Sequence, residues 1–131
     1  MRVLLDTHVA VWMAIDSPRL SSAARQLLES PGTTRLWSAA SSWELAIKWR
    51  QGRIRLPDDP AAWIPRMLAE LRIDSLQIRH DHAVHAAALP EHHKDPFDRM
   101  LVAQAEIEEA SLMTADRQLA TYDVEVVPAT G

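Results

Sequence analysis

The sequence predicts an α/β fold, a three-layer sandwich whose mainly parallel central sheet is flanked by helices. Three observations support this prediction. Short apolar runs of strand length alternate along the chain with longer segments whose apolar residues recur at helical spacing. Two of these runs, Val3–Leu5 and Leu112–Thr114, resemble strands that are buried on both faces. The segments between the strands are long enough to be helical crossovers, which parallel strands require.

The chain opens with the strand Val3–Leu5, which two helices follow. The strand ends at Asp6, and Thr7 offers a hydroxyl that can cap the next helix. That helix covers residues 8–15, because its apolar side chains recur at helical spacing until a Ser-Pro pair ends it. A second helix covers residues 21–28 and stops at a Ser-Pro-Gly sequence.

The middle of the chain repeats the order of strand, turn and helix. Thr33–Trp37 is a short β-prone run, and the hydroxyls of residues 38–42 can cap a helix over residues 43–51, which a glycine ends. Residues 53–59 are expected to form a loop. The segment 60–71 has helical apolar spacing, with its internal proline still in the first turns.

The last part of the chain is predicted to hold a strand over residues 73–78 and a helix that Asp81 caps. Asp95 has the short polar side chain of an N-cap and precedes a proline, so the next helix begins at residue 96 and leaves Asp98 on its first turn. That helix ends near Glu109. Three shorter elements follow, namely a strand over 111–114, a helix over 115–122 and a strand over 124–127. The tail after them is expected to fray.

The composition describes an ordinary folded protein and limits its class of function. The chain has 131 residues, of which 47% are hydrophobic and 24% charged, so we expect a single domain over residues 1–131. There is no cysteine, no apolar run of membrane-spanning length and no signal peptide, which predicts a cytoplasmic protein without membrane attachment. The net charge of −4 argues against binding nucleic acid through a globally basic surface.

Four carboxylates occupy equivalent positions, each just after a strand or in the first turn of a helix. They are Asp6 after the first strand, Glu44 and Asp98 in the first turns of two helices, and Asp116 two residues beyond Thr114. Side chains that follow parallel strands gather at the carboxyl edge of the sheet, where such folds bind ligands. We therefore expect these residues, which we call the acidic quartet, to share one site.

A shared site for four carboxylates requires a cation. Two carboxylates about 4 Å apart repel each other by about 4 kcal/mol at an effective dielectric constant of about 20. Oxygen ligands without any thiolate favour a hard ion, Mg²⁺ or Mn²⁺, over structural zinc. Such ions activate water and polarise phosphoryl oxygens, so the acidic quartet predicts a nuclease-type site.

Each acid also has a purely structural interpretation. Asp6 and Asp116 are well placed to cap the helices that follow them. Glu44 lies four residues before Lys48, the favourable order for an ion pair on a helix surface. Asp98 at the third helical position can complement the helix dipole. The functional interpretation depends on all four acids meeting at one edge.

Four segments carry a family resemblance, namely Leu4–His8, Ser38–Lys48, Leu89–Ala105 and Leu112–Asp116. In residue types, order and spacing they resemble the PIN-domain ribonucleases, specifically the VapC toxins. The resemblance covers nearly the whole chain and implies a PIN-like fold with Mg²⁺- or Mn²⁺-dependent endoribonuclease activity. It also implies a cognate VapB-type antitoxin that holds the enzyme inactive, a groove for that antitoxin among the first helices, and a homodimer.

Carried over position by position, the catalytic residues of the family fall on the acidic quartet, which is intact. Asp6 and Asp98 resemble the firmest metal ligands, and Glu44 and Asp116 would complete the site directly or through water. Thr114 resembles a hydroxyl residue that hydrogen-bonds within the site, although an ordinary place at a strand end is an equal interpretation.

Two other groups of residues have open roles. A run of cations and two further arginines beside the acids are candidates for guiding an RNA backbone, or are solvated helix ends: Lys48, Arg50, Arg53, Arg55, Arg99 and Arg117. The five tryptophans are expected mainly in the core, with base stacking or partner binding as the alternative: Trp12, Trp37, Trp43, Trp49 and Trp63.

Two other functions compete with the nuclease. The histidine-rich stretch is compatible with an HD-type metallophosphohydrolase: His80-Asp81, His82, His85, His92 and His93. That class is nearly all helical, whereas this sequence predicts buried strands. The other competitor is a non-enzymatic binding module that uses its acids only for stability.

Overall fold

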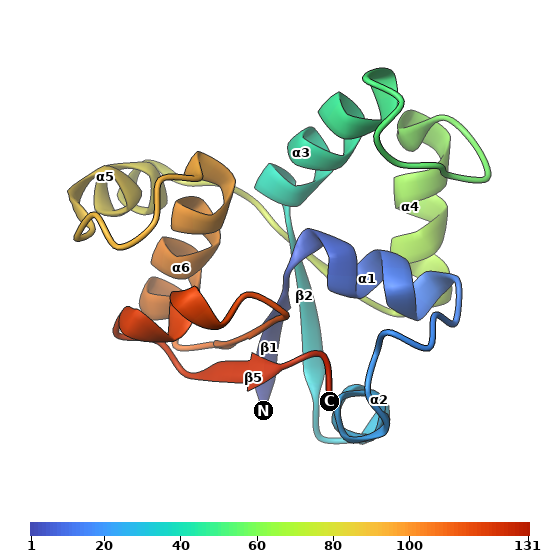
Figure 1. Ribbon diagram of the computed structural model, residues 1–131, viewed down its shortest axis with the longest axis horizontal. Coiled ribbons are helices and arrows are strands. Elements are labelled where there is room, and N and C mark those ends of the chain that lie inside the picture. The colour runs from blue at the N-terminus through green and yellow to red at the C-terminus, as the bar shows by residue number, and fades with distance from the viewer.

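The computed structural model describes all residues, Met1–Gly131, and contains one five-stranded sheet in the order β3-β2-β1-β4-β5 (Figure 1). Every neighbouring pair of strands is parallel. The strands are β1 (Arg2–Leu5), β2 (Thr34–Ser38), β3 (Asp74–Leu76), β4 (Ser111–Thr114) and β5 (Val126–Pro128). The predicted α/β class with a mainly parallel sheet is thereby confirmed, and the sheet is parallel throughout.

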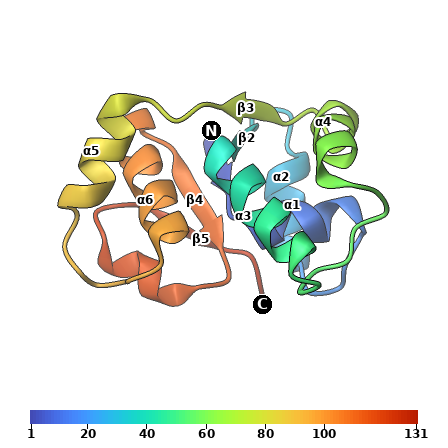
Figure 2. The ribbon, with the colours of Figure 1, turned by 90° about the horizontal axis from the view of Figure 1, so that it is seen from above.

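Helices cover both faces of the sheet (Figure 2). They are α1 (Thr7–Ala14), α2 (Ser22–Glu29), α3 (Ala39–Arg50), α4 (Pro60–Glu70), α5 (His80–Ala88) and α6 (Pro96–Glu108), with a short 3₁₀ helix, η1 (Arg117–Thr121), before the last strand. None of them combines the length and the apolar character that crossing a membrane requires.

The core consists of two apolar clusters, one on each face of the sheet. A cluster of 16 buried residues joins the sheet to α1–α4, and a cluster of 13 joins it to α5, α6 and η1. Successive strand residues alternate between them, since Val3 and Leu5 belong to the first cluster and Leu4 to the second. This alternation explains why the strand is apolar at each position from Val3 to Leu5.

Several element boundaries differ from the prediction because other residues act as caps. The Ser38 hydroxyl accepts the Ala40 N–H at 3.0 Å, so α3 begins at Ala39, four residues before the predicted start at Trp43. Asp6, rather than Thr7, caps α1. Helix α5 begins one residue before Asp81, and the segment after Asp116 forms only a 3₁₀ helix.

The predicted fraying of the tail is wrong. Ala129 is 0% exposed, and its N–H donates to the Thr114 carbonyl at 3.0 Å while its carbonyl accepts the Ser21 N–H at 2.9 Å. Strand β5 is displaced toward the C-terminus relative to the prediction, and its pairing with β4 carries the tail back over the start of α2. These contacts, made by residues far apart in the sequence, hold the tail in place.

The strand ends that matter for function lie at one edge of the sheet. Strands β1 and β2 run upward in Figure 1, and α1 and α3 begin at their upper ends. Leu5 pairs with Met113, and the Asp6 N–H donates to the Met113 carbonyl at 2.9 Å, so the residues that follow β1 and β4 emerge side by side. This edge carries the candidate site.

Candidate active site

Asp6 both caps α1 and lies in the candidate site. One of its carboxylate oxygens, Oδ1, accepts the Thr7 N–H at 2.6 Å, and the other, Oδ2, accepts the Thr114 hydroxyl at 2.7 Å. Burial raises the pKa of Asp6 above its ordinary value, and the hydrogen bonds from Thr114 and Thr7 counteract part of that increase. Of the two interpretations of Thr114 that the sequence left open, the structure thus shows the hydrogen bond to Asp6.

Asp98 lies on the first turn of α6, where the Asp95 side chain caps the helix. The Asp95 Oδ1 atom accepts the N–H groups of Phe97 and Asp98 at 2.8 and 3.3 Å, which confirms that Asp95 is the cap. The Asp98 side chain is 15% exposed. Burial is the main cause that raises the pKa of Asp98 to about 8, and the remaining causes are the nearby charges of Asp6, Asp95, Glu44 and Asp116.

Glu44 is buried in the first half of α3. Its Oε1 atom accepts the Thr7 hydroxyl at 2.6 Å, and its Oε2 atom lies 3.1 Å from the Lys48 Nζ atom. The helix-surface ion pair considered from the sequence is thus present. Because the Thr7 bond turns Glu44 toward the start of α1, the pair does not remove Glu44 from the site.

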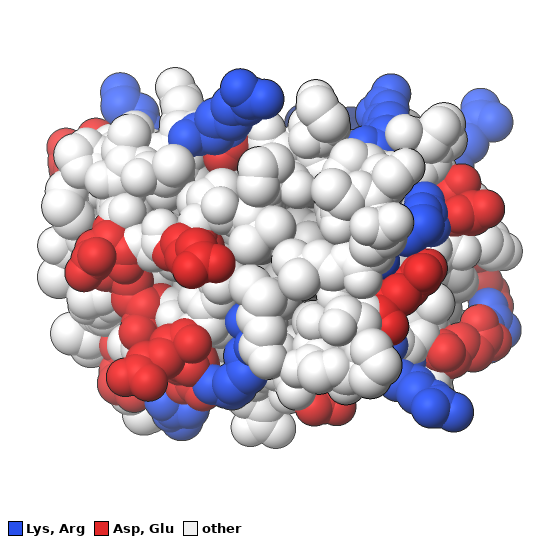
Figure 3. Space-filling model, turned by 90° about the horizontal axis from the view of Figure 1, so that it is seen from below, with Lys and Arg blue, Asp and Glu red and all other residues white.

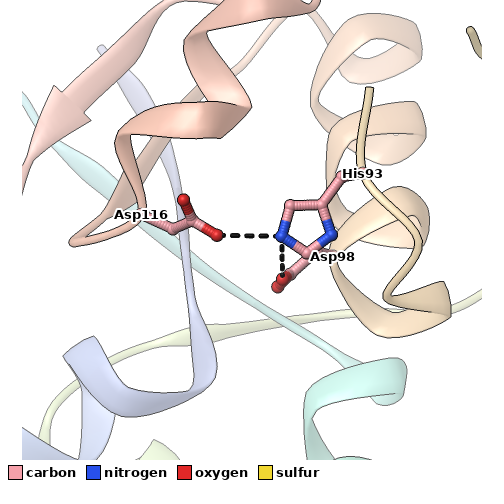
Figure 4. Close-up of side chains that lie close together, drawn as sticks. All are labelled: His93, Asp98 and Asp116. Carbon is pink, nitrogen blue, oxygen red and sulfur yellow. Dashed lines mark hydrogen bonds and ion pairs between the residues drawn. The ribbon is translucent and has the colours of Figure 1, made fainter. Parts of the chain in front are cut away.

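Asp116 follows β4 and caps η1. Its Oδ1 atom accepts the Gln118 N–H at 3.0 Å, while the Thr114 hydroxyl accepts the Asp116 N–H at 3.0 Å. The second carboxylate oxygen, Oδ2, lies 3.0 Å from the Nε2 atom of His93 (Figure 4). Asp116 is therefore fixed by backbone and side-chain contacts on both of its oxygens.

The four acids meet in one pocket of about 190 Å³. The other residues that line this pocket are His8, Val9, Trp12, Lys48, Asp95 and Ala115. Only one of these side chains, Lys48, carries a permanent positive charge, so the carboxylates outnumber the cations in the pocket. The structure thus brings the acidic quartet together as expected, and its oxygen donors suit a hard divalent cation.

His93 contacts two members of the acidic quartet, although the sequence indicated it only as part of the histidine-rich stretch. It lies in the loop between α5 and α6, with Nε2 3.0 Å from Asp116 Oδ2 and 3.5 Å from Asp98 Oδ2 (Figure 4). Its Nδ1 atom accepts the Asp95 N–H at 3.1 Å. Its position two residues before the helix cap was the signal available in the sequence.

The alternative HD-type site is wrong. A five-stranded sheet is incompatible with a nearly all-helical class. The residues of the stretch are also used separately, since Asp81 pairs with Arg79 at 2.9 Å and the buried His82 bonds Glu108 at 3.1 Å. Asp81 and His82 thus support α5 and α6, whereas His93 contacts the acidic quartet, so the stretch does not form a common metal site.

Arg99 has a structural role that its position beside Asp98 did not indicate. Its guanidinium donates to the carbonyls of Ala86, Leu89 and Pro90 at 2.9, 2.9 and 3.0 Å. These carbonyls lie at the end of α5, where helix carbonyls lack partners within the helix. Arg99 therefore joins the end of α5 to the start of α6, and its guanidinium is already engaged.

The tryptophans are divided between the core and the surface. Trp37 and Trp63 are buried, whereas Trp12 and Trp49 are only partly buried, so fewer tryptophans lie in the core than predicted. Trp43, next to Glu44, is 65% exposed and its ring meets the Phe97 ring edge-on at 5.2 Å. This aromatic pair bridges the starts of α3 and α6 beside the acidic pocket.

Comparison with known proteins agrees with this fold. The chain is 38% identical over 122 residues to "Ribonuclease VapC22" of Mycobacterium tuberculosis (strain ATCC 25618 / H37Rv), an alignment that covers 92% of this chain and 91% of the relative. It is 32% identical over 75 residues to "Ribonuclease VapC16" of the same strain, which covers 54% of this chain and 53% of that protein.

Solved structures share the fold at lower identity. A chain of VapBC2 from Rickettsia felis, bound to a DNA fragment from the promoter, has a TM-score of 0.73 and 15% identity over 98% of both chains. A chain of DNA-bound VapBC from Salmonella typhimurium has a TM-score of 0.70 and 15% identity, also over 98% of both chains. Residues 3–125 match the PIN domain, and the chain therefore belongs to the PIN-domain family.

Proposed function

We propose that this protein is a divalent-metal-dependent endoribonuclease that hydrolyses RNA phosphodiester bonds and acts as the toxin of a toxin–antitoxin pair. The observation that carries the proposal is the meeting of Asp6, Glu44, Asp98 and Asp116 in one pocket. Their mutual repulsion contributes to the raised pKa of Asp98, and a bound cation would relieve it. The relatives named as VapC ribonucleases support the same activity.

We assign the catalytic role to the whole acidic quartet. Asp6 and Asp98 would hold the ion, Mg²⁺ or Mn²⁺, because they are the two acids whose pKa burial and neighbouring charge raise. When bound, the ion would activate water and polarise the scissile phosphate. Thr114 and Thr7 hold Asp6 and Glu44 in place through their hydroxyl groups, and Glu44 and Asp116 complete the negative wall of the pocket.

The RNA strand is proposed to cross a neighbouring groove of about 440 Å³ that shares Glu44 and Asp95 with the acidic pocket. Lys48, Arg53 and Lys94 line this groove, and neither Arg53 nor Lys94 has an acidic partner within 4.0 Å. Unpaired cations favour phosphate contacts. On the face that Figure 3 shows, lysines and arginines are scattered among acidic and uncharged side chains, so it offers no comparable path.

We further propose a cognate VapB-type antitoxin as the partner, because several of the similar solved structures are VapBC or toxin–antitoxin complexes. A cleft of about 280 Å³ between α3 and α4, which includes Trp49 and Ile64, is the candidate groove for an apolar antitoxin segment. The family resemblance supports a homodimer, a single PIN domain over residues 1–131 and action in the cytoplasm. A small DNA-binding protein encoded next to this gene, and co-purifying with it, would test the partner.

The activity is tested by incubating purified, antitoxin-free protein with structured RNA, with and without Mg²⁺. We expect cleavage only with the ion, and at least a 100-fold loss in Asp98→Asn, since electrostatic groups in active sites commonly contribute that much. Asp74→Asn is the matched control, because Asp74 is exposed on β3 and does not line the pocket.

Three outcomes contradict the proposal. Cleavage that persists in Asp98→Asn places the activity elsewhere or in a contaminant. Cleavage that does not depend on a divalent ion excludes the metal mechanism. An absence of cleavage on transfer, ribosomal and messenger RNA, with the fold intact, favours the binding-module alternative.

A further inference from the structure

We propose that His93 is a positioning residue of this site, a neutral hydrogen-bond donor that orients Asp116 and Asp98, and not a ligand of the metal. This role of His93 deepens the proposed nuclease function, and the kinetic test of the role rests on that function. It concerns a side chain whose Nε2 atom lies 3.0 Å from Asp116 Oδ2 and 3.5 Å from Asp98 Oδ2. One ligand atom from each of His93, Asp98 and Asp116 lies within 4.8 Å of the other two, a spacing that would also suit a metal ion.

The backbone of Asp95 determines which nitrogen of His93 carries the proton. The Asp95 N–H points at Nδ1 from 3.1 Å, so Nδ1 must accept and cannot itself bear a hydrogen. In a neutral imidazole the hydrogen then lies on Nε2. In a charged ring Nδ1 would also carry a hydrogen, and this N–H would face the Asp95 N–H, donor against donor. His93 is therefore neutral in this arrangement, and its Nε2–H faces the two carboxylates (Figure 4).

This tautomer is unsuited to holding a metal. A ligating nitrogen needs a free lone pair, and Nε2 gains one only if the hydrogen moves to Nδ1, where the Asp95 N–H already points. Histidines that ligate metals normally donate their other N–H to an acceptor such as a carboxylate or carbonyl. His93 has a donor at that position instead.

The position of His93 supports the same role. It does not line the acidic pocket but a separate surface cleft, together with Ala87, Glu91, Lys94 and Arg99. The imidazole thus contacts Asp98 and Asp116 from the side away from the acidic pocket, and it leaves the pocket side of both carboxylates to a cation. A neutral donor between two carboxylates also lowers their repulsion without adding a charge that competes with that cation.

The proton position is measured directly by long-range ¹H–¹⁵N NMR of the histidine rings in the metal-free protein. We expect the neutral form with the hydrogen on Nε2 and a bare Nδ1, unchanged when Mg²⁺ is added. Pulsed EPR of the Mn²⁺-loaded protein should show no nitrogen coupling from a directly bound imidazole. A hydrogen on Nδ1, or a directly coordinated nitrogen that disappears in His93→Gln, overturns the proposal.

Kinetics test the positioning role. His93→Leu should lower kcat by about 10- to 100-fold, the usual effect of losing a group that orients metal ligands, with little change in KM. His93→Gln, which keeps an N–H donor, should recover much of the rate. His92→Leu is the matched control, because the exposed His92 only meets the Tyr122 ring edge-on at 5.1 Å.

An unchanged kcat in His93→Leu, or equal losses in the Leu and Gln variants, contradicts positioning by hydrogen bonding. If the parent protein cleaves no RNA, the proposed nuclease function fails. The NMR and EPR results then still decide whether His93 is a donor or a ligand, so the two failures are distinguishable.

Discussion

At the scale of the residue, capping and function prove to be compatible. Asp6 uses Oδ1 to cap α1 and Oδ2 to bind Thr114, and Asp116 uses Oδ1 to cap η1 and Oδ2 to meet His93. Each carboxylate oxygen has two lone pairs, so these bonds leave further acceptor capacity. The capping bonds of Asp6 and Asp116 are therefore compatible with the proposed place of both acids in the site.

Asp98→Asn should stabilise the metal-free protein at alkaline pH. The pKa of Asp98 is raised from 3.8 to about 8 on folding, so the folded state binds more protons between these values and the free energy of unfolding falls as pH rises through that window. Asparagine has no such dependence. We expect a gain of at least about 1 kcal/mol at pH 8 and a smaller gain at pH 5, measured by urea unfolding in EDTA.

Asp74→Asn serves as the reference for Asp98→Asn, since the exposed Asp74 carboxylate has no ion pair and its substitution should leave the free energy of unfolding unchanged. A loss of stability in Asp98→Asn at pH 8, or a gain that grows toward pH 5, would show that the Asp98 carboxylate is well tolerated without metal. Burying the Asp98 carboxylate without a metal would then cost little free energy, and this cost would not be a feature of the site.

At the scale of the element, the order of strands and helices was readable from the sequence, whereas exact starts were not. Several hydroxyls precede α3, and periodicity does not tell which one caps it; only the bond from Ala40 N–H identifies Ser38. Three members of the acidic quartet were predictable because Asp6 and Asp116 follow strands and Asp98 opens a helix. Glu44 lies in the second turn of α3, so its predicted place in the first turn is wrong. His93 was not predictable, because its loop reaches Asp116 only through the packing of α6 beside β4.

Two N-caps allow the contribution of α6 to the site to be separated from general stability. Asp95 caps α6 and Asp59 caps α4 in the same way, each accepting an N–H of the first turn at 2.8 or 2.9 Å. Asp95→Ala and Asp59→Ala should each cost about 1 kcal/mol in urea unfolding. Only Asp95→Ala should also slow RNA cleavage, because Asp98 is carried by the turn that this cap holds.

Equal cleavage rates for the two capping variants, measured where both are fully folded, would contradict this reasoning. The start of α6 would then be positioned without its cap, for instance by the Arg99 contacts with the end of α5. A similar slowing in Asp59→Ala would instead point to a general effect of lower stability.

At the scale of the whole molecule, the site lies where the two helical layers meet across the sheet edge. Glu44 comes from α3 on the side of the larger apolar cluster and Asp98 from α6 on the other side, while Asp6 follows β1 between them. The far end of α6 is held at the opposite edge, where Glu108 meets Arg2 of β1 as well as Arg79 and His82. Helix α6 thus connects an end held by paired charges to an end whose acids, Asp95 and Asp98, have no lysine or arginine partner.

Glu108→Gln should weaken the protein at neutral pH and much less in acid. The hydrogen bond from His82 is the main cause that lowers the pKa of Glu108 below its ordinary value of 4.5, and Arg79 lowers it further. The stabilising contribution of the Glu108 carboxylate is therefore present above pH 4.5 and is lost as pH falls through its lower pKa in the folded state.

We expect Glu108→Gln to lose about 1 kcal/mol of stability at pH 7. The gap to the parent should close on acidification in urea unfolding, while Glu70→Gln, an exposed glutamate without an ion pair, stays level with the parent. A gap that widens toward low pH would mean that the packing of the Glu108 side chain, and not its charge, holds the end of α6.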